Sequence, residues 1–211
     1  MNPFAKEEEY GILVNKDNPL SEDYVPEELV PVVSKVKTFR DPNYKLLLHP
    51  AALVAFERLK KLAAKFSCDL QISSGYRSYE YQEFLLNEAI KEKGDDAHRT
   101  VAHPGCSEHQ TGLAIDYKLY SPKKLAEMNL WESTVFRSKL LISHSLVRAT
   151  AHKFGFIERY PKGTEHLTGF VHEPWHLRYV GENTAKIMRK GNLIHEQYHA
   201  ICSQMRLKNC Y

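Results

Sequence analysis

The sequence predicts an α+β fold, in which a small antiparallel sheet is flanked by helices. Helical and strand-like segments do not alternate as βαβ units, which opposes a parallel sheet. The strand candidates are short; Gly75 ends one of them and Pro174 interrupts another. The chain has 211 residues, of which 43% are hydrophobic and 26% charged, enough for one domain with its own core.

The first 48 residues are irregular in this prediction. Prolines are spread through them, among them those at positions 19, 26, 31 and 42. Prolines at this spacing oppose long helices and favour an extended segment. We therefore expect an N-terminal arm over residues 1–48, packed on a single domain over residues 49–211.

The elements follow from periodicity and from their boundaries. Apolar residues at helical spacing predict a helix over 49–66, and Ser78 is a suitable N-cap for a second helix over 79–93, which ends at Gly94. Further helices are expected over 143–154, 182–190 and 194–207. Strands are expected over 69–73, 112–117, 156–160 and 168–180. Residues 119–141 show no clear pattern and are expected to form a variable loop.

The charge pattern argues against two classes of partner. The net charge is only +3 and there is no long basic run, so the chain lacks the footprint of a nucleic-acid-binding protein. No apolar run approaches the roughly 20 residues that a membrane-spanning helix needs. The sequence does not set the oligomeric state.

The N-terminus and the cysteines predict a cytoplasmic location. Residues 1–10 contain three consecutive glutamates and no apolar stretch, unlike a signal peptide. The alternative is a protein of the cell envelope whose export signal has been removed. The four cysteines form no CxxC pair, and reduced thiols are expected rather than two disulfides.

Two short segments carry the chemistry. Residues 107–116 read Ser-Glu-His-Gln-Thr-Gly-Leu-Ala-Ile-Asp, and residues 173–176 read Glu-Pro-Trp-His. Two histidines and one carboxylate commonly hold a catalytic zinc ion, whose fourth position stays open for water. A further carboxylate is what such a site needs to move protons.

The spacing of the first segment requires a turn. His109 and Asp116 would lie about 23 Å apart in a strand and about 10 Å apart along a helix, whereas metal–ligand bonds are about 2 Å long. Gly112 lies between them and permits the turn. In the second segment Pro174 excludes a regular helix, and Trp175 is expected to wall the site.

A second zinc-like pattern lies near the C-terminus. Residues 195–199 read His-Glu-Gln-Tyr-His, which matches the HExxH motif of helical zinc peptidases. Only twelve residues follow, none of them Asp or Glu, so the usual downstream carboxylate ligand is missing. We therefore expect an exposed helix that packs through Tyr198, Ile201 and Met205, and no metal site.

The ordered motifs Ser-x-His, then Gly and Asp, then Glu-x-x-His resemble the VanY-type family of zinc D-alanyl-D-alanine carboxypeptidases, relatives of the D,D-dipeptidase VanX. The likeness covers residues 12–181, including 75–77 and 155–161. Residues 104–110 are most similar to the bifunctional VanXY branch, which lacks an export signal and acts inside the cell. The resemblance implies a D-Ala-D-Ala peptidase/Hedgehog-like zinc fold for the domain over residues 49–211.

The resemblance also implies the chemistry of the motif residues. One zinc ion is expected on His109, Asp116 and His176. Glu173 is expected to be the general base that activates water and then protonates the leaving amine.

Four further roles concern the substrate. By resemblance, Arg77 steadies the carbonyl oxygen as it becomes an oxyanion, although its segment alone favours a surface salt bridge. Ser107 and Gln82 are expected to hold the substrate, with Ser107 near its terminal carboxylate. Tyr76 is expected to be a wall of the pocket.

The implied reaction is zinc-dependent hydrolysis of terminal D-Ala-D-Ala, in the free dipeptide, in the pentapeptide precursor of peptidoglycan, or in both. Such hydrolysis depletes the target of glycopeptide antibiotics such as vancomycin. Two alternatives stay open. One is an L,D-carboxypeptidase that trims tetrapeptide stems with the same zinc. The other is a non-catalytic zinc-containing module that binds cell-wall peptide.

Overall fold

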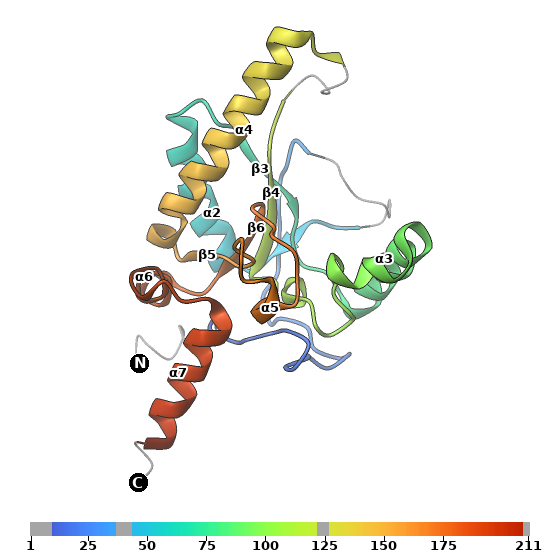
Figure 1. The fold of residues 1–211 in the computed structure, drawn as a ribbon, viewed down its shortest axis with the longest axis vertical. Helices are drawn as coiled ribbons and strands as arrows, with labels where there is room; N and C mark the ends of the chain where they lie inside the picture. Colours follow the sequence, from blue (N-terminus) through green and yellow to red (C-terminus); the bar gives the residue numbers. More distant parts are fainter. Residues whose placement is uncertain (1–9, 37–43, 122–126, 209–211) are drawn as a thin grey trace.

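The computed structural model describes residues 10–36, 44–121 and 127–208, which build two antiparallel sheets and the helices around them (Figure 1). The larger sheet has the strand order β3-β4-β6-β5. Its strands are β3 (Leu70–Ser74), β4 (Ala114–Leu119), β6 (His176–Tyr179) and β5 (Phe156–Glu158). The smaller sheet pairs β1 (Val30–Pro31) with β2 (Leu47–Leu48). The predicted α+β class is confirmed.

The described helices fall close to the predicted positions, with the exceptions of α4, which begins earlier than predicted, and α5, which was not predicted. The α-helices are α2 (Pro50–Ala64), α3 (Tyr79–Lys93), α4 (Leu130–Thr150), α5 (Glu165–Thr168), α6 (Glu182–Gly191) and α7 (His195–Lys208). The 3₁₀ turns are η1 (Gly94–Arg99), η2 (Glu108–Thr111) and η4 (Ala151–Phe154). In Figure 1, α2 and α4 lie on one side of β3 and β4, and α3 lies on the other.

Helix α2 begins and ends for identifiable reasons. His49 is its N-cap, whose Nδ1 accepts a hydrogen bond from the Ala51 amide at 3.2 Å, and Pro50 occupies the first helical position. The helix buries the face that carries Ala52, Ala55, Phe56, Leu59 and Ala63. The predicted helix extended to Phe66, but this residue lies beyond the end of α2 and is 54% exposed.

The core lies on one face of the larger sheet. Ile115 and Tyr117 of β4 and Leu177 of β6 are buried there against residues of α2 and α4. Because successive side chains of a strand point to opposite faces, Asp116 and His176 project from the other face. The burial of the core residues therefore fixes which polar side chains meet on the far side.

The loop predicted over 119–141 is wrong in its second half, because α4 already begins at Leu130. The side chain of Asn129 accepts from the Glu132 amide, and the Glu132 carboxylate accepts from the Asn129 amide, which makes a capping box. Leu130 and Trp131, the first two residues of α4, are 84% and 75% exposed. Apolar residues on the solvent side obscure the helical stripe, which is why periodicity did not show it.

The strand predicted over 168–180 is also wrong in its first part. Helix α5 ends at Thr168, and only β6 is extended. Between them the His176 amide donates to the Glu173 carbonyl at 3.1 Å, so the chain turns at Pro174. Proline has no N–H to give to a strand ladder, which favours this turn. The strand predicted over 112–117 starts instead at Ala114.

The described part of the N-terminal segment lies on the body. Leu13 and Val14 are buried, and the Leu20 amide donates to the Gly105 carbonyl at 2.9 Å. The side chain of Gln110 donates to the Ser21 carbonyl at 2.9 Å. The division of the chain into an arm and a domain at residue 48 stays a prediction.

Of the helices that the structure describes, none combines the length and the apolar character needed to cross a membrane.

Gly112 supplies a test of the turn that precedes β4. Its φ is +67°, and a Cβ there would lie 2.8 Å from Leu29 Cδ2. Gly163 has a similar φ of +88°, but no atom lies within 4 Å of its hypothetical Cβ. Gly163→Ala is expected to cost only backbone strain, about 1–2 kcal/mol. Gly112→Ala should lower the free energy of unfolding further, as measured by urea denaturation; equal losses would contradict a role for the close contact.

Candidate metal centre

The three candidate ligands come from two strands and one short turn. His109 lies in η2 and Asp116 in β4, and the backbone reverses between them at Gly112 in the left-handed conformation. His176 begins β6 and is the cross-strand partner of Asp116. The Tyr117 amide donates to the Trp175 carbonyl, so the neighbouring Asp116–His176 pair is not itself hydrogen-bonded through its backbone. Side chains approach most closely at such pairs.

The ligand atoms of His109, Asp116 and His176 all lie within 4.8 Å of one another. His109 Nε2 is 3.4 Å from Asp116 Oδ2, and His176 Nδ1 is 3.2 Å from Asp116 Oδ1. Two ligands held about 2 Å from one tetrahedral ion are separated by about 3.3 Å. Asp116 Oδ1 is also buried without a hydrogen-bond partner among the described residues. The spacing and the unsatisfied oxygen both fit a divalent ion at this point.

The backbone orients His109. Its Nδ1 lies 2.7 Å from the Gly75 carbonyl oxygen, which leaves Nε2 free to face Asp116. Burial, with the positive charge of Arg77 nearby, lowers the pKa of His109 to about 4, so the ring is neutral at physiological pH. A larger residue does not fit in place of Gly75, because its Cβ would clash with the Leu47 carbonyl oxygen.

His176 has a different environment, although its side chain is only 4% exposed. Burial by itself lowers its pKa, but the carboxylates of Asp116 and Glu108 outweigh burial and raise the pKa to about 9. The two histidine rings stand edge to face, with centroids 4.9 Å apart. At neutral pH, and with no metal ion bound, the His176 ring is therefore protonated. A metal ion that binds to its Nδ1 must displace that proton.

Glu173 lies beside the three ligands. One of its carboxylate oxygens is 3.8 Å from His176 Nδ1, and its side chain is 13% exposed. Its amide donates to the Tyr160 carbonyl at 3.2 Å, and the Tyr117 hydroxyl donates to the adjacent Pro174 carbonyl at 3.0 Å. Burial raises the pKa of Glu173 to about 7, with the negative charge of Asp116 adding to the effect. A carboxyl group with this pKa can both accept and return a proton near neutral pH.

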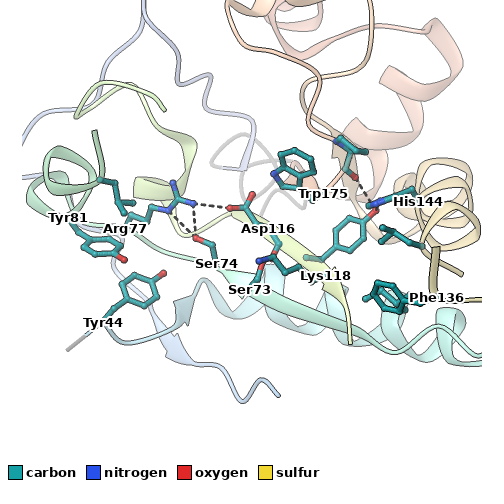
Figure 2. A pocket seen from close by; sticks show the side chains of 15 residues that line it. Tyr44, Ser73, Ser74, Arg77, Tyr81, Asp116, Lys118, Phe136, His144 and Trp175 are labelled. Atoms are coloured by element: carbon teal, nitrogen blue, oxygen red, sulfur yellow. Dashed lines mark hydrogen bonds and ion pairs between the residues drawn. The ribbon is translucent and has the colours of Figure 1, made fainter. Parts of the chain in front are cut away.

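Arg77 lies between Ser74 and Asp116 (Figure 2). Its Nη2 donates to Asp116 Oδ2 and to Ser74 Oγ, both at 2.9 Å, and its Nε donates to Ser74 Oγ at 3.0 Å. Gln82 Oε1 accepts from Nη1 at 3.4 Å, and Gln82 Nε2 is held by the Ala102 carbonyl at 2.9 Å. Arg77 is therefore part of the centre and not a surface salt bridge.

Two cavities meet at the centre. The first, the metal-centre cavity, has a volume of about 430 Å³ and is lined by Gln82, Ser107, His109, Asp116, Glu173 and His176, among others. The second, the flanking cavity, has a volume of about 680 Å³ and is lined mainly by Tyr44, Tyr81, Phe136, Leu140, Pro174 and Trp175 (Figure 2). Both cavities are lined by Arg77, Leu85, Asp116 and Trp175.

Tyr76 is the one candidate site residue that lines neither of these two cavities. Its backbone carbonyl accepts from the Tyr44 hydroxyl at 2.7 Å, and it is Tyr44 that faces the flanking cavity. Ser107 and Gln82 are both buried and line the metal-centre cavity. Trp175 separates the two cavities while remaining 42% exposed.

Sequence reasoning missed a buried ionic cluster behind His176. We call it the Glu108 cluster; it consists of Glu108, Arg159, Arg178, His195 and Glu196. Arg159 and Arg178 contact Glu108 Oε1 at 2.8 and 3.2 Å, and all three side chains are fully buried. Burial raises the pKa of Glu108, but the two guanidinium groups outweigh it and hold the pKa well below its usual range. The sequence signal for this cluster is Glu108 itself, the acidic residue between Ser107 and His109.

The HExxH segment belongs to this cluster. The expected exposed helix is wrong for its first turn, because His195 is fully buried and its Nδ1 lies 3.5 Å from Glu108 Oε1. Glu196 accepts two hydrogen bonds from Arg159, at 3.0 and 2.5 Å. His199 is exposed. In the described part of the chain, the group of metal-ligating side chains found is the one at residues 109, 116 and 176.

Comparison with known proteins gives a consistent result. The family model described as VanY, D-alanyl-D-alanine carboxypeptidase, matches residues 45–182. The putative carboxypeptidase YodJ of Bacillus subtilis is 37% identical over 187 residues, which are 88% of this chain and 65% of YodJ. The bifunctional D-Ala-D-Ala dipeptidase and carboxypeptidase VanXYC of Enterococcus gallinarum is 34% identical over 91% of this chain and 94% of its own. The chain thus spans about two thirds of one relative and nearly all of the other.

Solved structures show the same fold. The LdcB LD-carboxypeptidase matches with a TM-score of 0.71 and 36% identity over 89% of this chain and 84% of its own. A vancomycin-resistance D,D-pentapeptidase VanY in complex with Zn(II) matches with a TM-score of 0.72 and 26% identity over 90% and 98%. The family match covers more than half of the chain, and its ordered motifs meet in one centre. This chain therefore belongs to the VanY family of D-alanyl-D-alanine carboxypeptidases.

Proposed function

We propose that this chain is a zinc peptidase that hydrolyses the terminal D-Ala-D-Ala bond of peptidoglycan precursor peptides. One observation carries the proposal: His109, Asp116 and His176 converge beside the half-buried Glu173 at the wall of an open cavity. Three protein ligands and a neighbouring acid are typical of catalytic zinc, whereas structural zinc has four protein ligands. This arrangement favours an enzyme over a non-catalytic binding module.

Zinc supplies Lewis-acid chemistry when bound, since it polarises a carbonyl group and makes water acidic near neutral pH. Glu173 takes the proton of the attacking water and returns it to the amine that leaves. The raised pKa of Glu173, about 7, suits a group that must do both. Arg77 lies next to Asp116, where its guanidinium stabilises the negative charge that develops on the carbonyl oxygen.

The two cavities suggest how the substrate lies. Ser107 and Gln82 line the metal-centre cavity, where they hold the terminal D-Ala with its carboxylate near Ser107. The rest of the peptide occupies the flanking cavity, whose aromatic and aliphatic walls offer contact area. A free dipeptide leaves this second cavity empty. The arrangement therefore favours carboxypeptidase action on longer peptides over dipeptidase action, and such action depletes the vancomycin target.

The second candidate is L,D-carboxypeptidase activity on tetrapeptide stems. It is favoured by the 36% identity to the LdcB LD-carboxypeptidase. The two reactions differ in the configuration of the residue on the acyl side of the bond. Release of D-Ala from tetrapeptide but not from pentapeptide would select this candidate.

We infer a cytoplasmic location, in line with the similarity to the VanXY branch. The described cysteines support it, because Cys68, Cys106 and Cys202 are free and two of them are buried. Unpaired thiols are typical of reducing compartments. Cys210 lies outside the described residues. Cell fractionation that finds the native protein in the envelope would contradict this location.

Removal of the metal tests the cofactor. Dialysis against a chelator is expected to abolish D-Ala release, because no other group at the centre supplies the Lewis acid. Addition of one equivalent of zinc should restore the activity. The assay is D-Ala release from a pentapeptide, and a metal-stripped protein of full activity would contradict the proposal.

Substitution of Glu173 tests the base. Glu173→Gln is expected to lower kcat by about 10²–10⁴-fold, because the amide cannot accept the proton. Zinc content should stay at one ion per chain, as measured by elemental analysis. Glu165→Gln removes an exposed acid from the nearby α5 and should change neither quantity. A Glu173→Gln protein of near-normal kcat would end the general-base assignment.

The flanking cavity is tested with two neighbouring leucines of α4. Leu140 lines the cavity, whereas Leu141 is 70% exposed. Leu140→Ala is expected to raise the KM for pentapeptide several-fold and to leave D-Ala-D-Ala hydrolysis unchanged, because the dipeptide does not reach this wall. Leu141→Ala should change neither. An equal effect of Leu140→Ala on both substrates would show that the cavity does not hold the longer peptide.

A further inference from the structure

The two histidine ligands differ in what lies behind them. His109 Nδ1 contacts a backbone carbonyl, that of Gly75. Behind His176, in contrast, Nε2 faces Glu108 Oε2 at 3.7 Å. Both of these atoms are buried, and neither has a hydrogen-bond partner within the described residues. Because a buried polar atom without a partner is costly, the two atoms are each other's natural partners.

The Glu108 cluster holds this carboxylate in place. Its other oxygen, Oε1, is bound by Arg159 and Arg178, which leaves Oε2 directed at His176. Arg159 is fixed in turn by the two oxygens of Glu196 in α7. The two acids and the two arginines balance in charge, so removal of one of them would leave an uncompensated buried charge.

The N-terminal segment completes the cluster. Arg178 Nη2 donates to the Tyr10 and Ile12 carbonyls at 3.0 and 2.8 Å. His195 Nε2 lies 3.2 Å from the Gly11 carbonyl oxygen, and Asn15 donates to Glu196 at 3.3 Å. The cluster therefore joins both ends of the described chain to the back of one metal ligand.

We propose that Glu108 is a positioning residue for the ligand His176, and that α7 holds it in place through Glu196 and Arg159. This inference rests on the proposed metal centre. The carboxylate accepts the Nε2–H of His176, which fixes the tautomer that offers Nδ1 to the ion and makes that nitrogen a stronger donor. The HExxH segment thus serves the centre from behind, without ligating a metal itself.

Zinc affinity of the metal-free protein, measured by competition with a chromophoric chelator, tests the proposal. Glu108→Gln is expected to weaken zinc binding by about 10–100-fold. Glu108→Asp keeps the charge between the two arginines and preserves the fold, but its shorter side chain does not reach His176, so it should weaken binding as well. Glu196→Gln should give a smaller loss, of a few-fold, because Arg159 keeps a neutral hydrogen bond.

Two controls separate positioning from stability. Met188→Ala opens the small core beneath α6 without removing a member of the Glu108 cluster, and should lower the unfolding temperature without changing zinc affinity. His199→Ala removes the exposed histidine of α7 and should change neither. The absorption bands of the cobalt-substituted protein give a second readout, since they should shift for the Glu108 variants and not for Met188→Ala.

The outcomes distinguish this inference from the function on which it rests. If His176→Ala abolishes zinc binding while folded Glu108→Gln or Glu108→Asp binds zinc as tightly as the unaltered protein, the positioning role is wrong and the centre stands. If His176→Ala itself leaves zinc binding intact, the proposed centre is wrong.

Discussion

The antiparallel pairing of β4 with β6 is the constraint on which the candidate centre depends. It sets Asp116 opposite His176 on the face of the sheet that points away from the core. A slip of either strand by one residue would turn its own ligand, Asp116 or His176, into the core and bring Ile115 or Leu177 to the site. The register is fixed because those apolar residues must be buried, so the hydrophobic core determines the geometry of the polar centre.

The same centre holds its groups in different electrostatic states. Burial keeps His109 neutral, whereas the carboxylates beside His176 raise its pKa to about 9, and burial brings that of Glu173 to about 7. One arginine lies in front of the centre beside Asp116, and two lie behind it around Glu108. A divalent cation fits between these arginines because the carboxylates that face it carry the negative charge that compensates its positive charge.

Local patterns predicted the elements that have clear ends. Helix α3 has its predicted bounds because Ser78 caps it and Gly94 ends it, and both signals are local. Helix α4 was recognised only in its last part, because exposed apolar residues such as Trp131 hide the stripe on which periodicity depends. The capping box of Asn129 and Glu132 is a local sequence pattern, and it marks the start of this helix.

The sequence by itself determined which residue types are available for zinc chemistry. It also determined that the chain must turn at Gly112 to bring two of them together, because metal–ligand bonds are short and the spacing of residues along a strand or helix is fixed. The tertiary structure alone decided that Tyr44 rather than Tyr76 lines a cavity and that Glu108 is surrounded by Arg159, Arg178 and His195. Those residues are separated by tens of positions, and contacts over such distances leave no periodic or spacing signal. They exist only because the packed sheet and α7 bring them to the same buried point.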